Sequence, residues 1–419
     1  MRFPFEWQEV APKTRPSGFV ASNPGSQGYN WSWLDSAVED IAAHGLQPVL
    51  LPYLAPLWAQ DGTTPAGVRP GSWKPDPTQF GDFGKALATR YSGHYKDPST
   101  GKTLPHVTYY QAWNEPNLSF DISPAWEKRG SSWVPESPNI YRPMLNAFYS
   151  AVKSVDSSDF VLAGGTAPYG DSRPVGSDPK KWRVRPLAFD RGLLCLTRGL
   201  KKVAGCGPVH FDALDNHPYA FGPPTQKPYH PDDVNIADTY KISRVLRAGL
   251  RAGTVLPAGS KQIWAGELSF ATDPPLHTKL GVPPARQARY IEESMYLLWR
   301  QHVSTVLLLD IRDMAPSKSH NPFFYGGLYF YSGAAKPSVT AFSFPFITRR
   351  LGGTHIQAWG RAPTGGTLRI ERQAGGKWEV VTSFAVSRHQ VFQTSVKDSH
   401  AASFRAQIGS DTSLIWTQG

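Results

Sequence analysis

The chain has 419 residues, of which 40 % are hydrophobic and 12 % aromatic, so it can form one large core with a smaller domain and is too apolar to be disordered throughout. No stretch approaches the roughly 20 apolar residues that cross a bilayer, and the first residues, MRFPFEWQEV, lack the basic, apolar and small-residue order of a signal peptide. The formal net charge is +11, but the basic residues are scattered in pairs such as Lys180-Lys181 without a nucleic-acid-binding motif. We therefore expect neither a membrane nor a nucleic acid as the main partner.

Short apolar segments of strand type alternate with longer segments of helical periodicity from residue 1 to about residue 350. The predicted strands are RFPFEW (2–7), QPVLLPYL (47–54), HVTYYQAW (106–113), FVLAGG (160–165), ALDNHPY (213–219), QIWAGEL (262–268) and TVLLLDI (305–311). The predicted helices between them cover residues 34–46, 80–95, 140–155, 187–200, 238–250 and 285–303. Such an alternation predicts an α/β fold of parallel strands, a TIM-type (β/α)8 barrel.

The pattern changes after Thr354. Runs with a period of two residues, such as HIQAWG, TLRIERQ and KWEVVTSFAV, are separated by turns that include Gly375-Gly376. They predict a small C-terminal antiparallel β-sandwich. We place the barrel at residues 1–350 and the sandwich, as an accessory domain, at residues 351–419. Its three tryptophans are expected in the core or at an interface, with carbohydrate binding as the alternative: Trp359, Trp378 and Trp416.

The chain has two cysteines, Cys195 and Cys206. A metal site would need more ligands at closer spacing, so the alternatives are a local disulfide and two buried thiols. We predict the disulfide, which implies an oxidising compartment and hence a secreted or cell-surface protein. No His-x-x-x-His pair, GxSxG motif or phosphate loop occurs in the sequence, and we expect no metal site.

The most informative motif is the predicted strand HVTYYQAW running into Asn114-Glu115-Pro116. A carboxylate at the carboxyl end of a barrel strand points into the mouth where TIM barrels have their active sites, and Pro116 ends the strand. The motif, with Trp113 before it, resembles the Asn-Glu-Pro signature of clan A glycoside hydrolases, which are retaining enzymes built on (β/α)8 barrels. The resemblance implies that Glu115 is the general acid/base and that Asn114 binds the sugar 2-hydroxyl. The alternative is a loop glutamate that caps the next helix.

The resemblance also nominates a nucleophile, because clan A enzymes have it at the end of strand seven. Counted from Glu115, strand seven is QIWAGEL, which makes Glu267 the candidate. Retaining hydrolysis requires the two carboxylates to lie about 5 Å apart. The alternative for Glu267 is a salt bridge at a strand end. Glu292 and Glu293 are weaker candidates, because they lie in a predicted helix whose charged side chains are expected to face solvent.

Four more residues are expected around the two carboxylates. Arg2 is similar to an arginine that pairs with the nucleophile in several clan members, and Tyr219 to a tyrosine that hydrogen-bonds it; the alternative for Arg2 is an ordinary surface residue. His217 is either a ligand contact or a neutral core histidine. Trp58 follows the predicted strand 47–54, which is strand three in the barrel count. It resembles a loop that shapes subsites, where an indole stacks on the apolar face of a sugar.

Two departures from the resemblance concern the strands. If RFPFEW is strand two of such a barrel, strand one is lacking from this chain, which leaves seven strands. At strand eight many clan members have a tryptophan, where this chain reads LLLDIRD. The segment GGLYFYSGAAKPSVTAFSFPF is similar to the final helix region of family 39 and related family 5 enzymes, which favours that side of the clan.

These patterns predict a retaining glycoside hydrolase that cleaves β-linked O-glycosidic bonds of oligo- or polysaccharides by double displacement and needs no cofactor. The alternative is a carbohydrate-binding or scaffolding protein on a truncated barrel that has lost catalysis. The identity of the sugar, endo or exo action and the oligomeric state cannot be predicted from the sequence.

Overall fold

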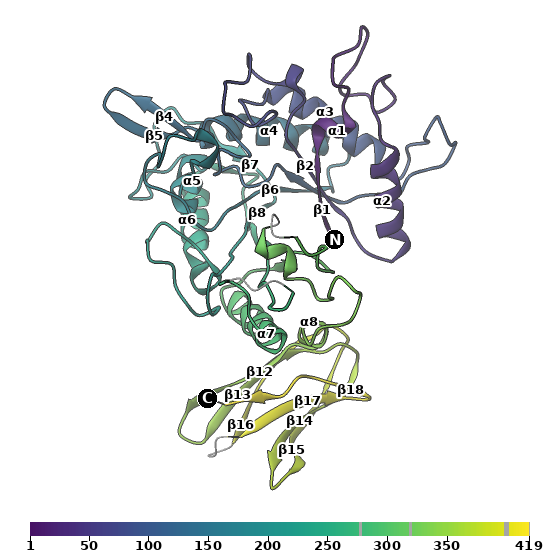
Figure 1. Ribbon diagram of the computed structural model, residues 1–419, viewed down its shortest axis with the longest axis vertical. Helices are drawn as coiled ribbons and strands as arrows, with labels where there is room; N and C mark the ends of the chain where they lie inside the picture. Colours follow the sequence, from purple (N-terminus) through teal and green to yellow (C-terminus); the bar gives the residue numbers. More distant parts are fainter. Residues whose placement is uncertain (276–278, 318–320, 398–401, 419) are drawn as a thin grey trace. The chain divides into compact units, whose positions relative to one another are not determined.

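The computed structural model describes residues 1–275, 279–317, 321–397 and 402–418 (Figure 1). They pack into two compact units. Unit 1 comprises residues 1–219, 227–267 and 303–307, and unit 2 comprises the described parts of 220–226, 268–302 and 308–419. The domain boundary that we placed at residue 350 falls inside strand β12 (Phe346–Gly352).

Unit 1 is built on a curled sheet of seven parallel strands in the order β1-β2-β3-β6-β8-β10-β11. These strands are β1 (Arg2–Glu6), β2 (Val49–Tyr53), β3 (Tyr109–Ala112), β6 (Phe160–Thr166), β8 (Ala213–Asn216), β10 (Gln262–Leu268) and β11 (Thr305–Leu308). The order along the sheet follows the chain, as in a barrel whose strands are joined by helical crossovers. The prediction of a barrel-type α/β fold with seven strands is confirmed.

The helices of unit 1 follow the strands in turn. They are α1 (Trp7–Val10), α2 (Ser32–Ala43), α3 (Pro77–Arg90), α4 (Ser137–Val155), α5 (Pro186–Leu193) and α6 (Tyr240–Arg251). Short strand pairs accompany them: β4 (Trp126–Arg129) with β5 (Ser132–Pro135), and β7 (Val209–His210) with β9 (Val255–Leu256).

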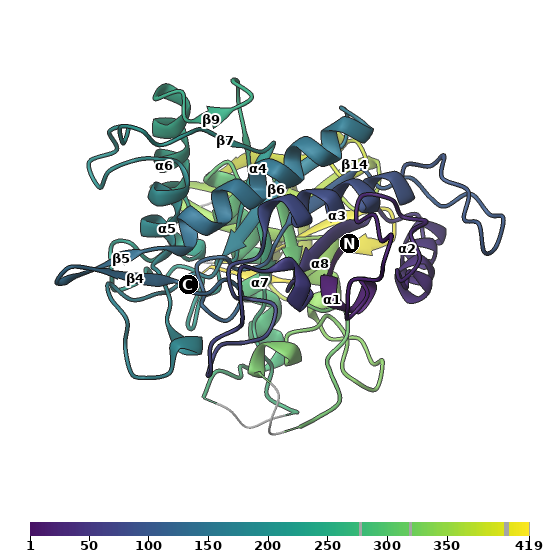
Figure 2. The same cartoon turned by 90° about the horizontal axis from the view of Figure 1, so that it is seen from above.

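Helices α3 and α4 lie side by side (Figure 2). Phe80 of α3 stacks on Phe148 of α4 with 4.8 Å between the ring centroids. Gly84 allows this approach, because a Cβ there would lie 2.7 Å from the Phe148 ring. Asp76 begins α3 by accepting a hydrogen bond from the Gln79 backbone N–H. This helix pair covers the part of the sheet from which the Asn-Glu-Pro motif emerges.

Two predicted helices end five or more residues before the expected position. The helix predicted over 80–95 ends at Arg90, because the chain then turns through Gly93 with a φ of 77°. The helix predicted over 187–200 ends at Leu193, because Cys195 adopts a left-handed φ of 55°. Cys195 and Cys206 form a disulfide, which confirms the predicted pairing.

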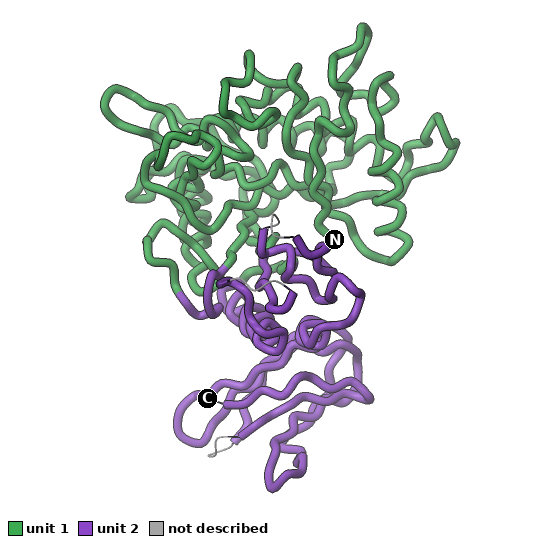
Figure 3. The backbone as a smooth tube through the Cα atoms, in the orientation of Figure 1, with its two compact units in different colours: residues 1–219, 227–267, 303–307 green, residues 220–226, 268–302, 308–419 purple. Residues whose placement is uncertain are grey.

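Unit 2, purple in Figure 3, contains α7 (Pro284–Arg300), α8 (Ser338–Ser343) and two antiparallel sheets. One sheet has the order β12-β13-β16, with β13 (His355–Arg361) and β16 (Val391–Lys397). The other has the order β15-β14-β17-β18, with β19 paired to β17. Its strands are β14 (Gly366–Ala374), β15 (Lys377–Val386), β17 (Ser403–Ile408), β18 (Asp411–Thr412) and β19 (Trp416–Thr417). The predicted antiparallel C-terminal sheets are therefore present.

The core of unit 2 is apolar and includes residues of both sheets and of α7. Trp359 and Trp416 are buried in it, whereas the Trp378 ring packs against the Arg405 guanidinium at 4.3 Å. Glu292 of α7 is also buried and accepts a hydrogen bond from the Phe346 N–H. The expectation that Glu292 faces solvent is wrong, because α7 packs against the first strand of the sandwich; burial raises the pKa of Glu292 to about 8.

None of the helices in the described ranges has both the length and the apolar character that a membrane crossing requires.

The disulfide closes a short loop, with a sequence separation of 11 between its cysteines. We predict that replacing Cys195 and Cys206 together with serine lowers the free energy of unfolding by about 2–3 kcal/mol, because the unfolded chain gains conformational freedom. Urea unfolding of both proteins measures the difference. A reductant should weaken the parent protein and leave the double variant unchanged; equal stability of the two proteins without reductant would contradict the prediction.

Candidate active site

Glu115 stands on a strained turn directly after β3. Trp113 has a φ of 76° and Glu115 a φ of 28°, a region that bulky side chains rarely adopt. Trp113 stabilises the turn, since its fully buried indole donates from Nε1 to the Asp121 carbonyl at 2.9 Å and packs edge-on against Phe80. The direction of the Glu115 side chain is therefore set by a buried anchor on the preceding strand end.

Glu267 lies at the carboxyl end of β10 and is held by two donors. Arg2 donates from Nη1 to Oε2 at 2.7 Å, and the Tyr219 hydroxyl donates to Oε1 at 2.6 Å. Burial alone would raise the pKa of Glu267, but the charges of His217 and Arg2 and these hydrogen bonds outweigh burial and hold the pKa below its ordinary value. Glu267 is therefore a carboxylate at neutral pH.

His217 brings the two glutamates together. Its Nδ1 lies 2.9 Å from Glu115 Oε1 and 3.6 Å from Glu267 Oε2. The His217 side chain is fully buried, whereas the Glu115 and Glu267 side chains are 19 % and 17 % exposed. Both carboxylates can therefore meet a ligand from solvent, and the imidazole lies behind them.

The shared nitrogen limits the distance between the two carboxylates. Glu115 Oε1 and Glu267 Oε2 can be no farther apart than the sum of their distances to His217 Nδ1. Carboxyl groups are about 5 Å apart in retaining glycosidases and roughly 6.5–9.5 Å apart in inverting ones. The sum of these two distances reaches only the shortest carboxyl separation found in inverting enzymes. The distance between the two glutamates therefore favours the retaining arrangement.

The His217 imidazole is held in its charged form. Burial alone would lower its pKa, but the charge of Glu267 and the hydrogen bonds with Asp215 and Glu115 outweigh burial and raise the pKa to about 10. Asp215 Oδ2 lies 3.5 Å from Nε2, on the side of the ring away from Glu115. The protonation state thus differs from that of the neutral core histidine considered from the sequence.

The Arg2 side chain is buried, with only 7 % of its surface exposed. It is therefore not the ordinary surface residue that the sequence left open. Besides Glu267 it bonds two residues at the end of β3. Its Nη2 donates to Asn114 Oδ1 at 2.7 Å, and its Nε donates to Gln111 Oε1 at 3.0 Å. The guanidinium thereby orients the Asn114 amide beside the glutamates. Arg2 and His217 thus supply the positive charge that faces the two glutamates.

Sequence reasoning missed Gln111 and Asp215, which support the site from inside the sheet. Asp215 Oδ1 accepts the Gly266 N–H at 2.6 Å, and Oδ2 accepts from Gln111 Nε2 at 2.7 Å. The spacing in the sequence could have indicated Asp215. It stands two residues before His217, and side chains with that spacing share one face of a strand.

Two glycines allow this close packing. A Cβ on Gly165 of β6 would lie 2.3 Å from His217 Nε2, and a Cβ on Gly266 of β10 would lie 2.2 Å from Asp215 Oδ2. Real Cβ atoms do not approach so closely. Any larger residue would therefore displace the imidazole or the carboxylate behind it.

A further carboxyl group, Asp121, stands beside Asn114. Its Oδ2 accepts from Asn114 Nδ2 at 3.3 Å, and its Oδ1 lies 3.4 Å from Arg69 Nη1. Burial, and then the charge of Glu115, raise the pKa of Asp121 well above its ordinary value. The Asn114 side chain is thus fixed at both ends, by Arg2 and by Asp121.

Trp58 has other neighbours. Its Nε1 donates to the Pro12 carbonyl at 2.8 Å, and its ring packs edge-on against Trp7 and Phe19. The structure thus brings together Arg2, Asn114, Glu115, His217, Tyr219 and Glu267, and places Trp58 in a separate aromatic cluster. The role of Trp58 as a sugar platform stays a prediction.

The chain was compared with known proteins. No protein-family model matches it, and no curated protein sequence gives a significant match. It is similar in structure to a family 39 glycoside hydrolase from the gut symbiont Bacteroides cellulosilyticus WH2, with a TM-score of 0.52 and 18 % identity over 95 % of this chain and 75 % of that one. This likeness shows the fold, an α/β fold of the TIM-barrel type, as the alternation of strands and helices predicts.

Two further solved structures match with lower scores. A glucosidase from Croceicoccus marinus has a TM-score of 0.47 and 12 % identity over 90 % of this chain and 81 % of that one. A GH30 endoxylanase from Clostridium papyrosolvens C71 has a TM-score of 0.44 and 10 % identity over 95 % and 87 %.

The charge state of His217 can be measured directly. We predict that its imidazole titrates near pH 10 in the folded protein, against about 6.5 for an unperturbed histidine. Its contribution to stability is therefore complete below pH about 6.5 and is lost as the pH rises through about 10. Imidazole ¹⁵N NMR, assigned by the signal missing from His217→Gln, gives the value. Titration of His217 near pH 6.5 would contradict the prediction.

Proposed function

We propose that the chain is a retaining glycoside hydrolase in which Glu267 is the nucleophile and Glu115 the general acid/base. The observation that carries this proposal is that both carboxylates contact one nitrogen of His217 while remaining accessible to solvent. A second observation supports the division of roles. Arg2 and Tyr219 both donate to Glu267, which favours the ionised form that a nucleophile needs.

In the first step, a Glu267 oxygen attacks the anomeric carbon while Glu115 donates a proton to the departing glycosidic oxygen. One carbon–oxygen bond forms to Glu267, the glycosidic bond breaks, and the leaving alcohol takes the proton. In the second step, Glu115 removes a proton from water, the water oxygen attacks the same carbon, and the bond to Glu267 breaks. Glu115 is then protonated again, and the anomeric configuration is retained.

The surrounding residues have distinct roles in this scheme. Arg2 and Tyr219 stabilise Glu267 as the charged leaving group of the second step. Asn114, oriented by Arg2 at 2.7 Å, contacts the sugar hydroxyl next to the anomeric carbon. His217 donates from Nδ1 to Glu115 Oε1, so the catalytic proton resides on the other oxygen of Glu115.

The substrate class that we propose is an oligo- or polysaccharide with β-linked O-glycosidic bonds. We also propose that the protein acts outside the cell. The disulfide Cys195–Cys206 supports this location, because disulfides form and persist in oxidising compartments.

The proposed function is tested with aryl β-glycosides that carry good leaving groups. We predict that Glu115→Ala lowers kcat for these substrates by about 10²–10⁴-fold, because hydrolysis of the glycosyl intermediate loses its general base. Azide should restore turnover and yield the β-glycosyl azide, because the small anion enters the space of the missing carboxyl and attacks the glycosyl intermediate. Release of the aryl alcohol measures kcat, and chromatography of the products detects the glycosyl azide.

The matched control is Glu127→Ala, which removes an exposed carboxylate paired with Arg129 on the β4–β5 hairpin and should leave kcat unchanged. Full activity of Glu115→Ala, or rescue without a glycosyl azide, would contradict the assignment. Binding of oligosaccharides without turnover in the parent protein would instead support the alternative of a carbohydrate-binding or scaffolding protein.

A further inference from the structure

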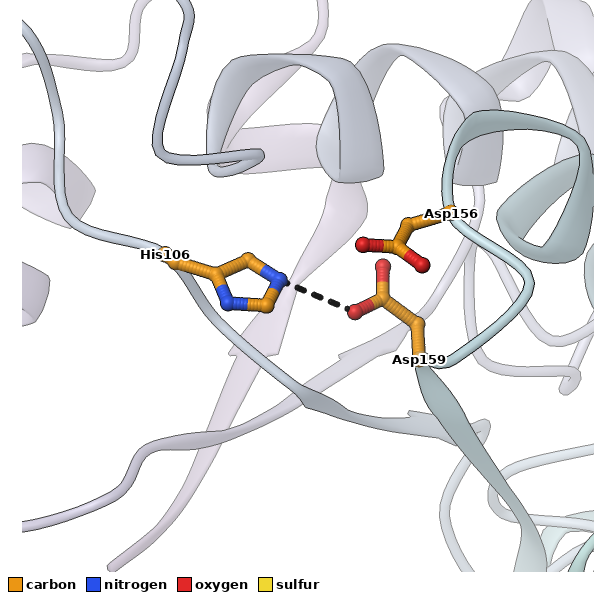
Figure 4. Close-up of side chains that lie close together, drawn as sticks. All are labelled: His106, Asp156 and Asp159. Atoms are coloured by element: carbon orange, nitrogen blue, oxygen red, sulfur yellow. Dashed lines mark hydrogen bonds and ion pairs between the residues drawn. The ribbon is translucent and has the colours of Figure 1, made fainter.

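A second polar cluster stands at the opposite, amino-terminal end of the strands. It consists of His106, Asp156 and Asp159 (Figure 4). His106 precedes β3, and both aspartates lie in the turn between α4 and β6. Tyr109 of β3 pairs in parallel with Phe160 of β6. The segment before β3, with His106, therefore lies beside the turn before β6, with the two aspartates. One ligand atom from each of the three side chains lies within 4.8 Å of the others.

Asp159 has an unsatisfied carboxylate oxygen in this cluster. Its side chain is 1 % exposed, and its Oδ1 lies 3.1 Å from His106 Nε2. Its Oδ2 has no hydrogen-bond partner among the described residues. Figure 4 shows this second oxygen turned toward the Asp156 carboxylate. A buried carboxylate oxygen without a donor is costly, and a second carboxylate facing it adds repulsion.

Tyr110 of β3 carries a second buried polar atom without a partner in the described part of the chain. Its hydroxyl is fully buried and has no hydrogen-bond partner among the described residues. Burial raises the pKa of Tyr110, and the charges of Asp159 and Asp156 raise it further. Tyr110 thus adds an unsatisfied polar group on the strand that His106 precedes.

We propose that His106 Nε2 and the carboxylates of Asp156 and Asp159 bind one divalent transition-metal ion, with Zn²⁺ as the best fit. One imidazole and two carboxylates, completed by water, match the four-coordinate preference of Zn²⁺. Ca²⁺ and Mg²⁺ fit less well, because they prefer oxygen ligands alone. His106 is 40 % exposed, which leaves a path for the ion to enter.

Other charges near the cluster influence its affinity for the metal ion. Asp156 directly follows the last residue of α4, where the negative end of the helix dipole favours a cation. Lys153 opposes binding, because its ammonium donates to the Asp159 carbonyl; the Asp212 carboxylate at 2.9 Å and the Ser157 carbonyl at 3.2 Å also hold it. A bound ion would fasten the start of β3 to the α4–β6 turn. It would therefore stabilise the sheet without touching Glu115 or Glu267.

The experiment is calorimetric titration of the full chain with ZnCl₂ after removal of metals with EDTA and dialysis. We predict one strong Zn²⁺ site per chain and a higher melting temperature in its presence. His106→Gln and Asp156→Asn should each weaken binding at least about tenfold. Both side chains are partly exposed, so these variants should fold. Circular dichroism checks that they do, and Co²⁺ in place of Zn²⁺ should give the visible absorption of a four-coordinate site.

The matched control is His94→Gln, an exposed histidine on the loop after α3, which should bind Zn²⁺ as the parent does. Equal affinity in His106→Gln, Asp156→Asn and the parent would place the ion elsewhere and overturn the proposal. Absence of both a binding heat and a change in melting temperature in the parent protein would overturn it as well. Neither outcome bears on the glycosidase proposal, since the readouts do not involve turnover.

Discussion

Two cations between three carboxylates hold the site of unit 1 together. Arg2 and His217 lie between Glu115, Asp215 and Glu267, at distances from 2.7 to 3.6 Å. Removing one member would leave a poorly solvated charge without a partner, which typically costs several kcal/mol. Arg2 stands on β1 and Glu267 on β10, which are not neighbours in the sheet. Their contact therefore requires the sheet to curl, so the ion pairs and the barrel curvature depend on each other.

Local strain and small residues make this arrangement possible. Trp113 and Glu115 adopt left-handed backbone conformations that only a well-anchored turn maintains. Gly165 and Gly266 leave the space that His217 and the carboxylate behind it occupy. The two ends of the strands thus have different characters: the carboxyl ends carry strained, charged groups suited to chemistry, and the amino ends carry groups suited to stability, as is usual in TIM barrels.

The strand order could be predicted, because an alternating pattern of strands and helices indicates a parallel sheet. The same pattern places Glu115 and Glu267 at the carboxyl ends of strands, whereas their catalytic roles stay a prediction. The protonation of His217 could not be predicted, because it is set by Asp215 and the two glutamates together, which register and curvature bring near from distant parts of the chain. Burial of Glu292 depends on packing between α7 and β12 that helical periodicity does not encode. The helix predicted over 187–200 ended early because the disulfide loop overrides its helical propensity.

The nucleophilic role of Glu267 is tested most directly by covalent trapping. The full chain is incubated with a fluorosugar that carries a good leaving group, because fluorine next to the anomeric carbon slows hydrolysis of the glycosyl–enzyme more than its formation. We predict a mass increase of one fluoroglycosyl group, located by peptide sequencing on Glu267. A label on another residue, or none from a sugar whose aryl glycoside the protein hydrolyses, would contradict double displacement at Glu267.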